Sequence, residues 1–287
     1  MNISREALKN FGLLRHPFQG DCQSHEEIYY SPDHGWVKAA LEQAARLAGC
    51  LVAVVGEVGS GKTTVKNDFI EKAEGEGVAI IQPYMLDKTQ LSVQHLEEAI
   101  VYGLDPNAKA KLRLSREARN RQLAQMLQAS TKAGRRHVLI IEEAQDLSVH
   151  VLKVLKRLVE IKAGNRACIS VVMIGQPEFL ARLDASRSYH LRELIHRTTV
   201  AEIAPLQNKT EVHEYLQLKF ADCGRVFDED SYGAILEVLS EAKQQRRWSA
   251  AYPLSINNLV AKSLNEAAAL GLETINADVI RSMKSAA

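Results

Sequence analysis

Residues 56–63 read GEVGSGKT, which fits the pattern G-x-x-x-x-G-K-[ST] of a phosphate-binding loop. The glycines allow backbone N–H groups to curl around the β- and γ-phosphates of a nucleotide without clashes from Cβ atoms. We expect Lys62 to reach the β- and γ-phosphate oxygens and the hydroxyl of Thr63 to ligate Mg²⁺. The predicted ATP-binding residues are Gly56, Glu57, Val58, Gly59, Ser60, Gly61, Lys62, Thr63 and Thr64.

The segments on either side of this loop support the same interpretation. The apolar run LVAVV at 51–55 is typical of a buried strand, and residues 64–73 are compatible with a helix. The N-terminus of such a helix adds partial positive charge beside the phosphates. The alternative is a glycine-rich turn in an unrelated α/β unit. We prefer nucleotide binding because strand, loop and helix occur in the required order.

An acidic pair, Glu142 and Glu143, follows the apolar run 138–141 about 80 residues after the loop. One carboxylate would organise Mg²⁺ and its waters, and the next would polarise the water that attacks the γ-phosphate. P-loop ATPases usually carry Asp at the first position. Glu142 adds one methylene and can still hold a metal-bound water, with a different geometry and rate. The alternative is a solvated acidic loop end.

Three further residues could act on the γ-phosphate. Gln176 ends a predicted strand, where many ATPases place a polar sensor; the alternative is a turn residue before Pro177. Arg192 and Arg197 precede the last predicted strand, where an arginine can reach the nucleotide of a neighbouring subunit. Arg197 is the first choice because it lies closest to the strand, and a surface role is the alternative for both arginines.

Strands alternating with helices predict an α/β fold in which a parallel five-stranded sheet is flanked by helices. After Pro205 the pattern changes to amphipathic helices, at about 208–222, 229–243, 255–270 and 276–285. The predicted domains are an N-terminal segment at 1–35, an ATPase core at 36–204 and an all-helical lid at 205–287. The predicted strands are 51–55, 78–81, 138–141, 168–174 and 198–203; the predicted core helices are about 35–48, 64–73, 115–132, 149–162, 178–183 and 189–196; residues 84–115 are mixed and partly basic.

Composition sets the remaining bounds on this chain of 287 residues. Its formal net charge of +1 gives no global attraction to nucleic acid or membrane, so any such surface must be local. No apolar run approaches the roughly 18 residues that span a bilayer, and the first residues lack the apolar core of a signal peptide. The four cysteines form no C-x-x-C pair and indicate reduced thiols. We therefore expect a cytoplasmic protein with no membrane association and no structural metal.

A basic cluster lies before and within the predicted helix 115–132. Arg116 and Arg119 are spaced i, i+3 and can share one helix face. Such a cluster would contact the phosphates of duplex DNA without reading sequence, and repetition in a ring or filament would multiply its avidity. The alternative is an ordinary solvated helix face. The predicted DNA-binding residues are Lys109, Lys111, Arg113, Arg116, Arg119 and Arg121.

With these residues placed, the chain resembles the AAA+ ATPases, and within them the ExeA-like branch. This branch includes secretion ATPases and transposition ATPases of the phage Mu B, TnsC and TniB type. Secretion members are expected to carry a membrane span and a periplasmic portion, neither of which is evident here, so the resemblance favours the transposition side. The motifs are FGLLRHPF at 11–18, GEVGSGKT at 56–63, VLIIEEAQDL at 138–147, MIGQPEFLARL at 173–183, LRELIHRTTVAEIAPL at 191–206 and YPLSINNLV at 252–260.

The resemblance implies an ATP- and Mg²⁺-dependent homo-oligomer, a ring or helical filament, that binds double-stranded DNA without sequence preference. Such a protein selects target DNA and recruits and stimulates a transposase, and hydrolysis then disassembles it. By resemblance Phe18, with Leu13, lines the adenine pocket; the alternative is core packing. Members commonly carry an arginine after the lid proline, whereas Leu254 follows Pro253 here. Two other hypotheses stay open: a cytosolic ATPase that remodels a protein complex such as a secretion apparatus, and a switch that holds ATP without useful turnover.

Overall fold

The structure, a computed structural model, describes residues 2–20, 27–85, 87–105, 113–184, 189–240 and 250–286. The chain divides into two compact units, which are described one at a time. The sheet unit contains Asp33–Glu57 and Val65–Ile203, and the helical unit contains Met1–Pro32, Val58–Thr64 and Ala204–Ala287.

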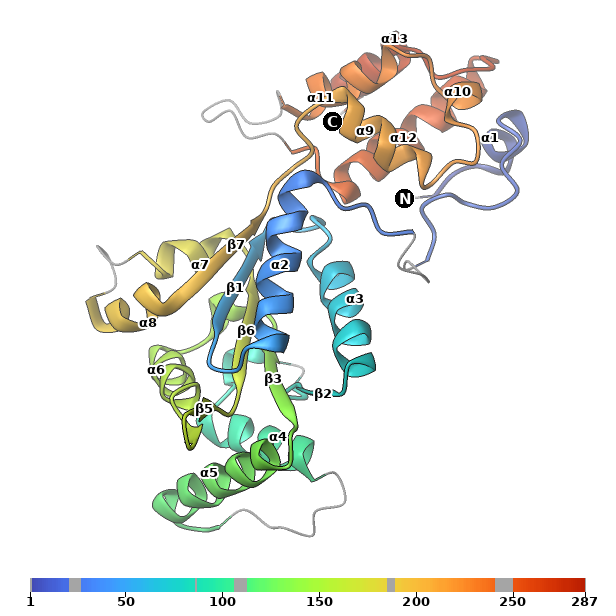
Figure 1. Ribbon diagram of the computed structural model, residues 1–287. Helices are drawn as coiled ribbons and strands as arrows, with labels where there is room; N and C mark the ends of the chain where they lie inside the picture. Colours follow the sequence, from blue (N-terminus) through green and yellow to red (C-terminus); the bar gives the residue numbers. More distant parts are fainter. Residues whose placement is uncertain are drawn as a thin grey trace. The chain divides into compact units, whose positions relative to one another are not determined.

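A parallel five-stranded sheet forms the centre of the sheet unit (Figure 1). Its strand order is β2-β3-β6-β1-β7, and every neighbouring pair is parallel. The predicted α/β fold with a five-stranded parallel sheet is therefore confirmed. The strands are β1 (Leu51–Gly56), β2 (Val78–Ile81), β3 (Arg136–Ile141), β6 (Ser170–Gly175) and β7 (Thr198–Ile203).

The central strands are apolar along their whole length because helices cover both faces of the sheet. All six residues of β1 and of β6 are buried. Alternate residues, such as Ala53, Ile141 and Met173, join one core cluster with side chains from the helices that follow β2, β3 and β6. The helices of this unit are α2 (Pro32–Arg46), α3 (Lys62–Gly75), α4 (Val93–Leu104), α5 (Arg116–Lys132), α6 (Val149–Leu158), α7 (Pro177–Arg182) and α8 (Arg192–Arg197), with 3₁₀ turns η2 (Lys88–Gln90), η3 (Ala144–Asp146) and η4 (Tyr189–Leu191).

Two parts of this unit differ from the prediction. Helix α4 lies in the segment that was read as mixed; Ser92 caps it, and Leu96 and Ile100 bury one face, so its apolar spacing is helical. Helix α6 ends at Leu158 rather than near residue 162, because a hairpin of β4 (Lys162–Ala163) and β5 (Arg166–Ala167) follows it.

One exposed edge of the sheet is partly covered by a tryptophan. Strand β7 is the edge strand beside β1. The indole Nε1–H of Trp36, on α2, donates a hydrogen bond of 3.2 Å to the backbone carbonyl of Val200, yet 58% of Trp36 is exposed. The bond occupies a backbone acceptor that an added strand could otherwise use.

A buried histidine joins β3 to its neighbours. His137 is 1% exposed, and its Nδ1–H donates to the carbonyl of Cys168 at 2.8 Å. Its Nε2 accepts a hydrogen bond of 2.8 Å from the hydroxyl of Ser130, at the end of α5. Burial lowers the pKa of His137, and the charge of Arg135 lowers it further.

The helical unit packs the N-terminal segment against the C-terminal helices. Helix α1 (Arg5–Asn10) contacts α12, and the side chain of Asn265 bonds both the N–H of Ser4 and the carbonyl of Asn2. A second core cluster runs from Ile3 to Ile280 and is separate from that of the sheet unit. Its other elements are α9 (Lys209–Gln217), α10 (Cys223–Val226), α11 (Ser231–Ser240), α12 (Pro253–Ala269), α13 (Ala277–Ser282) and the 3₁₀ turn η5 (Met283–Ala286).

Candidate functional site

The glycine-rich loop has the backbone of a phosphate cradle. Gly59 and Gly61 have φ angles of +77° and +94°, which side-chain-bearing residues rarely adopt. Among the described residues, apart from the immediate chain neighbours of Gly61, no atom lies within 4 Å of the place that a Cβ on this glycine would take. Ser60 is 1% exposed, and in the described part of the chain its buried Oγ has no hydrogen-bond partner. Leaving a buried hydroxyl unpaired lowers the free energy of unfolding by about 1–3 kcal/mol. The loop therefore keeps the Ser60 hydroxyl as an unused hydrogen-bond donor at a cost to the stability of the fold. These features fit a bound phosphate.

Within the helical unit, Leu254 packs directly on this loop. Its backbone N–H donates a hydrogen bond of 3.2 Å to the carbonyl of Gly59. A Cβ on Gly59 would lie 2.4 Å from the Cβ of Leu254, so only glycine fits there. Leu254 stands at the position where the resembling family commonly has an arginine. Here this position serves the packing of α12 on the loop.

In the sheet unit, the first acidic residue is held by a lysine. Lys66, one turn into α3, donates to Oε1 of Glu142 at 2.5 Å. The Lys66 side chain is 12% exposed, whereas that of Glu142 is 37% exposed. The longer side chain of Glu142 thus ends in an ion pair that links the end of β3 to the helix after the phosphate-binding loop.

The second acidic residue has an unusual backbone. Glu143 has a φ of +52°, and among the described residues it is the only non-glycine with positive φ. This conformation costs roughly 1–2 kcal/mol for a residue with a Cβ, and such strain clusters at functional sites. The carboxylate accepts hydrogen bonds from the amides of Gln145 at 2.6 Å and Gln176 at 3.4 Å. The structure therefore brings Glu143 and Gln176 together.

Two residues that hold this arrangement were not foreseen as site residues. Gln145 Oε1 accepts a hydrogen bond of 3.0 Å from the backbone N–H of Gln176, so it fixes the end of β6 to the turn after β3. The guanidinium of Arg182, on α7, donates to the backbone carbonyls of Gln145 and Leu147. Gln145 lies in the motif 138–147 and Arg182 in the motif 173–183, and these motifs are the signal that could have identified both residues.

The two candidate arginines before β7 lie in different surroundings. Arg197 pairs with Glu160 at 2.8 Å and with Glu193 at 3.4 Å, and Lys156 pairs with the same two carboxylates at 3.3 and 2.6 Å. The hydrogen bond from Lys156 lowers the pKa of Glu193. Half of the Arg197 side chain is exposed. Arg192 begins α8 and is exposed.

Phe18 packs in the helical unit. Its ring meets that of Phe220 edge-on at 5.6 Å between centroids, and it contacts the core cluster of this unit. Next to it, a hollow of about 470 Å³ is lined by Leu13, Pro17 and Phe220 among others. The ring is thus part of the core; the described lining of this hollow includes Leu13 but not Phe18 itself.

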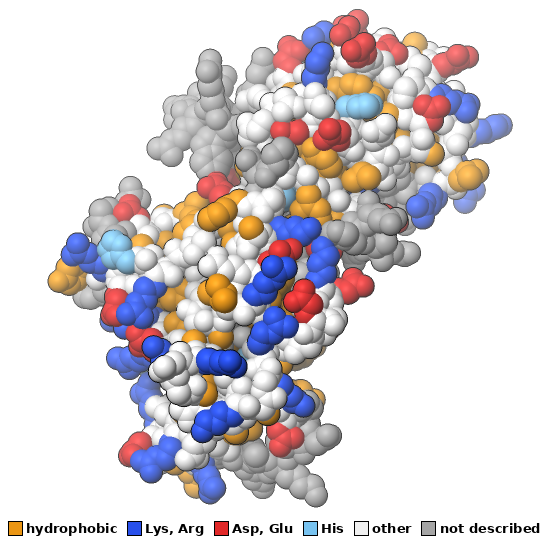
Figure 2. All heavy atoms as spheres, viewed as in Figure 1, with side chains coloured by type: hydrophobic (Ala, Val, Ile, Leu, Met, Phe, Trp, Pro, Cys, Tyr) orange, Lys and Arg blue, Asp and Glu red, His pale blue; other side chains and the backbone are white. Residues whose placement is uncertain are grey.

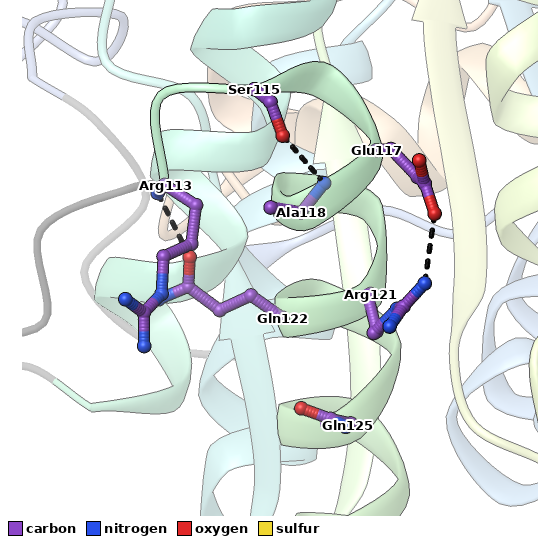
Figure 3. A pocket seen from close by; sticks show the side chains of 7 residues that line it. All are labelled: Arg113, Ser115, Glu117, Ala118, Arg121, Gln122 and Gln125. Carbon is purple, nitrogen blue, oxygen red and sulfur yellow. Dashed lines mark hydrogen bonds and ion pairs between the residues drawn. The ribbon is translucent and has the colours of Figure 1, made fainter.

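The predicted basic cluster is only partly available to a ligand. Lys109 and Lys111 lie outside the described residues. Arg119 forms an ion pair of 2.9 Å with Glu97, whose side chain is 7% exposed, so it ties α5 to α4. Figure 3 shows Arg121 turned toward Glu117, with which it pairs at 2.8 Å, beside a hollow of about 370 Å³ that Arg113 also lines. Arg116 donates to Nε2 of His150 at 3.1 Å.

The fold and this site define a P-loop ATPase domain of the AAA type. The family described as "AAA domain" matches residues 46–183. The match covers the phosphate-binding loop, the acidic pair and Gln176. In the described part of the chain, no helix is long and apolar enough to cross a membrane.

This chain is similar in sequence to one known secretion protein and in structure to proteins of known fold. The chain is 31% identical over 219 residues to General secretion pathway protein A of Aeromonas hydrophila. The aligned region is 75% of this chain and 38% of that protein. It thus spans well under half the length of this relative. The structure is also similar to the ORC2 protein of Aeropyrum pernix in ADPNP and ADP complexes (TM-score 0.54, 16% identity, 93% of this chain and 72% of that one) and to Drosophila ORC bound to DNA (TM-score 0.61, 12% identity, 97% and 65%). At these identities the two structures support the fold alone.

Proposed function

We propose that this chain binds and hydrolyses Mg²⁺-ATP and, in its ATP-bound state, assembles as an oligomer on duplex DNA, where it recruits and activates a transposase. Hydrolysis then drives disassembly. The observation that carries the ATPase part is the strained Glu143, whose carboxylate is met by Gln176 at the end of the neighbouring strand.

The roles of the individual residues follow from their chemistry. Lys62 and the loop amides would bind the β- and γ-phosphates, and the Thr63 hydroxyl and, through water, Glu142 would hold Mg²⁺, although Glu142 is paired with Lys66 in this structure. The ion supplies charge neutralisation to the phosphates. Glu143 accepts a proton from the attacking water, and Gln176 orients that carboxylate. Arg197 is our first choice, and Arg192 the second, for the arginine that contacts the nucleotide of a neighbouring subunit. To make this contact, Arg197 must break its ion pairs with Glu160 and Glu193.

The DNA-binding part rests on local charge. Residues 113–166 hold twelve Lys and Arg against five Asp and Glu in a chain whose net charge is +1. Figure 2 shows Lys and Arg side chains spread over the visible face of the sheet unit, with a smaller number of Asp and Glu side chains among them. Because no carboxylate is within ion-pair distance of Arg113 or Arg116 in the described part of the chain, these two are the first candidates for phosphate contacts. Lys109, Lys111, Arg119 and Arg121 stay secondary candidates.

A second candidate function has its own support. The similarity to General secretion pathway protein A favours an ATPase that remodels a protein complex. In that case nucleotide turnover would respond to a protein partner and not to DNA.

DNA binding measured by fluorescence anisotropy with a labelled duplex of random sequence, in ATP and in ADP, separates the two. We expect binding in ATP alone, loss of binding in Lys62→Ala, and a uniform loss across sequences with a shallower salt dependence in Arg113→Gln/Arg116→Gln. Equal binding in ATP and ADP would refute the proposed nucleotide control. No binding in either nucleotide would favour the remodelling function.

A further inference from the structure

Three helices of the sheet unit enclose a groove whose apolar floor takes no part in the nucleotide chemistry or the DNA contacts proposed above; Arg116, at its rim, is also a candidate for DNA contacts. The α4–α6 groove is formed by α4, α5 and α6 and has a volume of about 510 Å³. Its floor consists of Leu96, Ile100, Leu123 and Leu158, each no more than 6% exposed. The half-buried Val154 and Ala124 face it from α6 and α5. A groove of this composition binds apolar side chains.

The rim of the groove is cationic. Arg116 and Arg157 line it and are exposed, and Arg116 reaches across from α5 to His150 on α6. The one carboxylate in the wall, Glu97, is already paired with Arg119. With Glu97 neutralised, the free charges at the rim are positive, so the groove favours an occupant that places carboxylates beside its apolar groups.

Physical constraints select the kind of occupant. A DNA duplex presents phosphates and could not cover the apolar floor. An extended peptide would bring unpaired backbone N–H and C=O groups onto that floor. Every described lining residue belongs to a helix except Ile161, whose N–H and C=O already bond Leu158 and Cys168, so the described wall offers no strand edge to pair with them. A helix satisfies its own backbone and projects apolar side chains from one face.

We propose that the α4–α6 groove is a docking site for an acidic amphipathic helix of a partner protein. Apolar side chains of the helix enter between α4, α5 and α6, and its flanking carboxylates pair with Arg116 and Arg157. The proposal does not depend on DNA binding by this chain, and it holds for either function proposed above.

The test is anisotropy of a labelled synthetic helical peptide with leucine at i, i+3, i+4 and i+7 and glutamate beside them, titrated with the full-length protein. Two control peptides replace the leucines with serine or the glutamates with lysine. Val154→Arg and Ala124→Arg place a charge in the groove from opposite helices, so that a folding defect in one leaves the other informative. Lys153→Glu is the matched control, because Lys153 is exposed on α6 next to Val154 but does not line the groove.

We expect the acidic peptide to bind wild type and to bind both groove variants about tenfold more weakly or worse. Arg157→Glu should weaken binding to a similar extent, whereas Lys153→Glu should change it less than about twofold. Both control peptides should bind poorly. Equal binding to wild type and Val154→Arg would overturn the proposal. Equal binding of the serine peptide would also overturn it and would make this surface a general anion site that DNA could fill.

Discussion

Replacing Lys66 by methionine tests whether Glu142 is held by an ion pair or is free to bind Mg²⁺. Lys66 donates to Glu142 at 2.5 Å and is 12% exposed. Methionine keeps most of the side-chain length but removes the charge. We expect the folded state to lose stability and the Mg²⁺-dependent affinity for ATP to rise, because the substitution removes a cation beside a carboxylate that is proposed to hold the metal.

The magnitude follows from the distance and the exposure of the pair. At 2.5 Å and an effective dielectric constant of about 20, the gross Coulomb attraction is roughly 7 kcal/mol. Loss of hydration and side-chain freedom cancels most of it, and Glu142 at 37% exposure regains water when Lys66 is removed. We expect a net loss of about 1–2 kcal/mol, which lowers Tm by about 3–6 °C.

The assay is a double-mutant cycle with Glu142→Gln, in which stability is measured by urea unfolding without nucleotide. Lys66→Met should cost about 1 kcal/mol less in the Glu142→Gln background than in wild type. Titration of a fluorescent ATP analogue at several Mg²⁺ concentrations should give roughly threefold to tenfold tighter binding in Lys66→Met. A coupling free energy near zero would refute the ion pair. Weaker analogue binding would instead place Lys66 in contact with the nucleotide.

Three further perturbations follow from the site and the core. Glu143→Gln should retain ATP binding and lower turnover by roughly 10²–10³-fold in a steady-state phosphate-release assay, since it removes the general base; normal turnover would remove Glu143 from that role. Gly59→Ala should cost about 2 kcal/mol in urea unfolding because of its φ and its contact with Leu254, and Leu254→Gly should recover the steric part, since the contact at 2.4 Å is with the Cβ of Leu254. Because burial holds the pKa of His137 below its usual value of about 6.5, the unfolded chain binds more protons than the folded one. Stability should therefore fall as pH drops from about 7.5 to 5.5, and His137→Gln should flatten this slope; an unchanged slope would exclude His137 as its source.

The sequence predicted the parallel sheet well because its signals are local. A buried parallel strand is a continuous apolar run, and β2 was located at 78–81 by its apolar run alone. The predictions of a phosphate-binding loop and of an acidic pair likewise rest on adjacent residues. Helix α4 was missed, although its apolar spacing is helical, because the segment around it is mixed in composition and partly basic.

What the sequence could not predict depends on partners that are distant along the chain. Nothing near Lys66 indicates that it meets Glu142, 76 residues later. Arg119 looks like a surface cation in the sequence, but its partner Glu97 lies 22 residues earlier on another helix. A cluster of basic residues in the sequence therefore overstates the positive charge of the folded surface. Here the ion pair with the buried carboxylate of Glu97 neutralises Arg119.

Trp36, at the edge of the sheet, can serve as an intrinsic fluorescent probe of this surface. The chain has two tryptophans, Trp36 and Trp248, so Trp248→Phe leaves a single emitter. Trp36 is more than half exposed, while its indole N–H donates a hydrogen bond to the carbonyl of Val200. Indole emission shifts to shorter wavelength when water leaves the ring, so any subunit or ligand that covers this edge would be visible in intrinsic fluorescence. Assembly could then be followed in real time without a dye, in the same sample in which nucleotide turnover is measured.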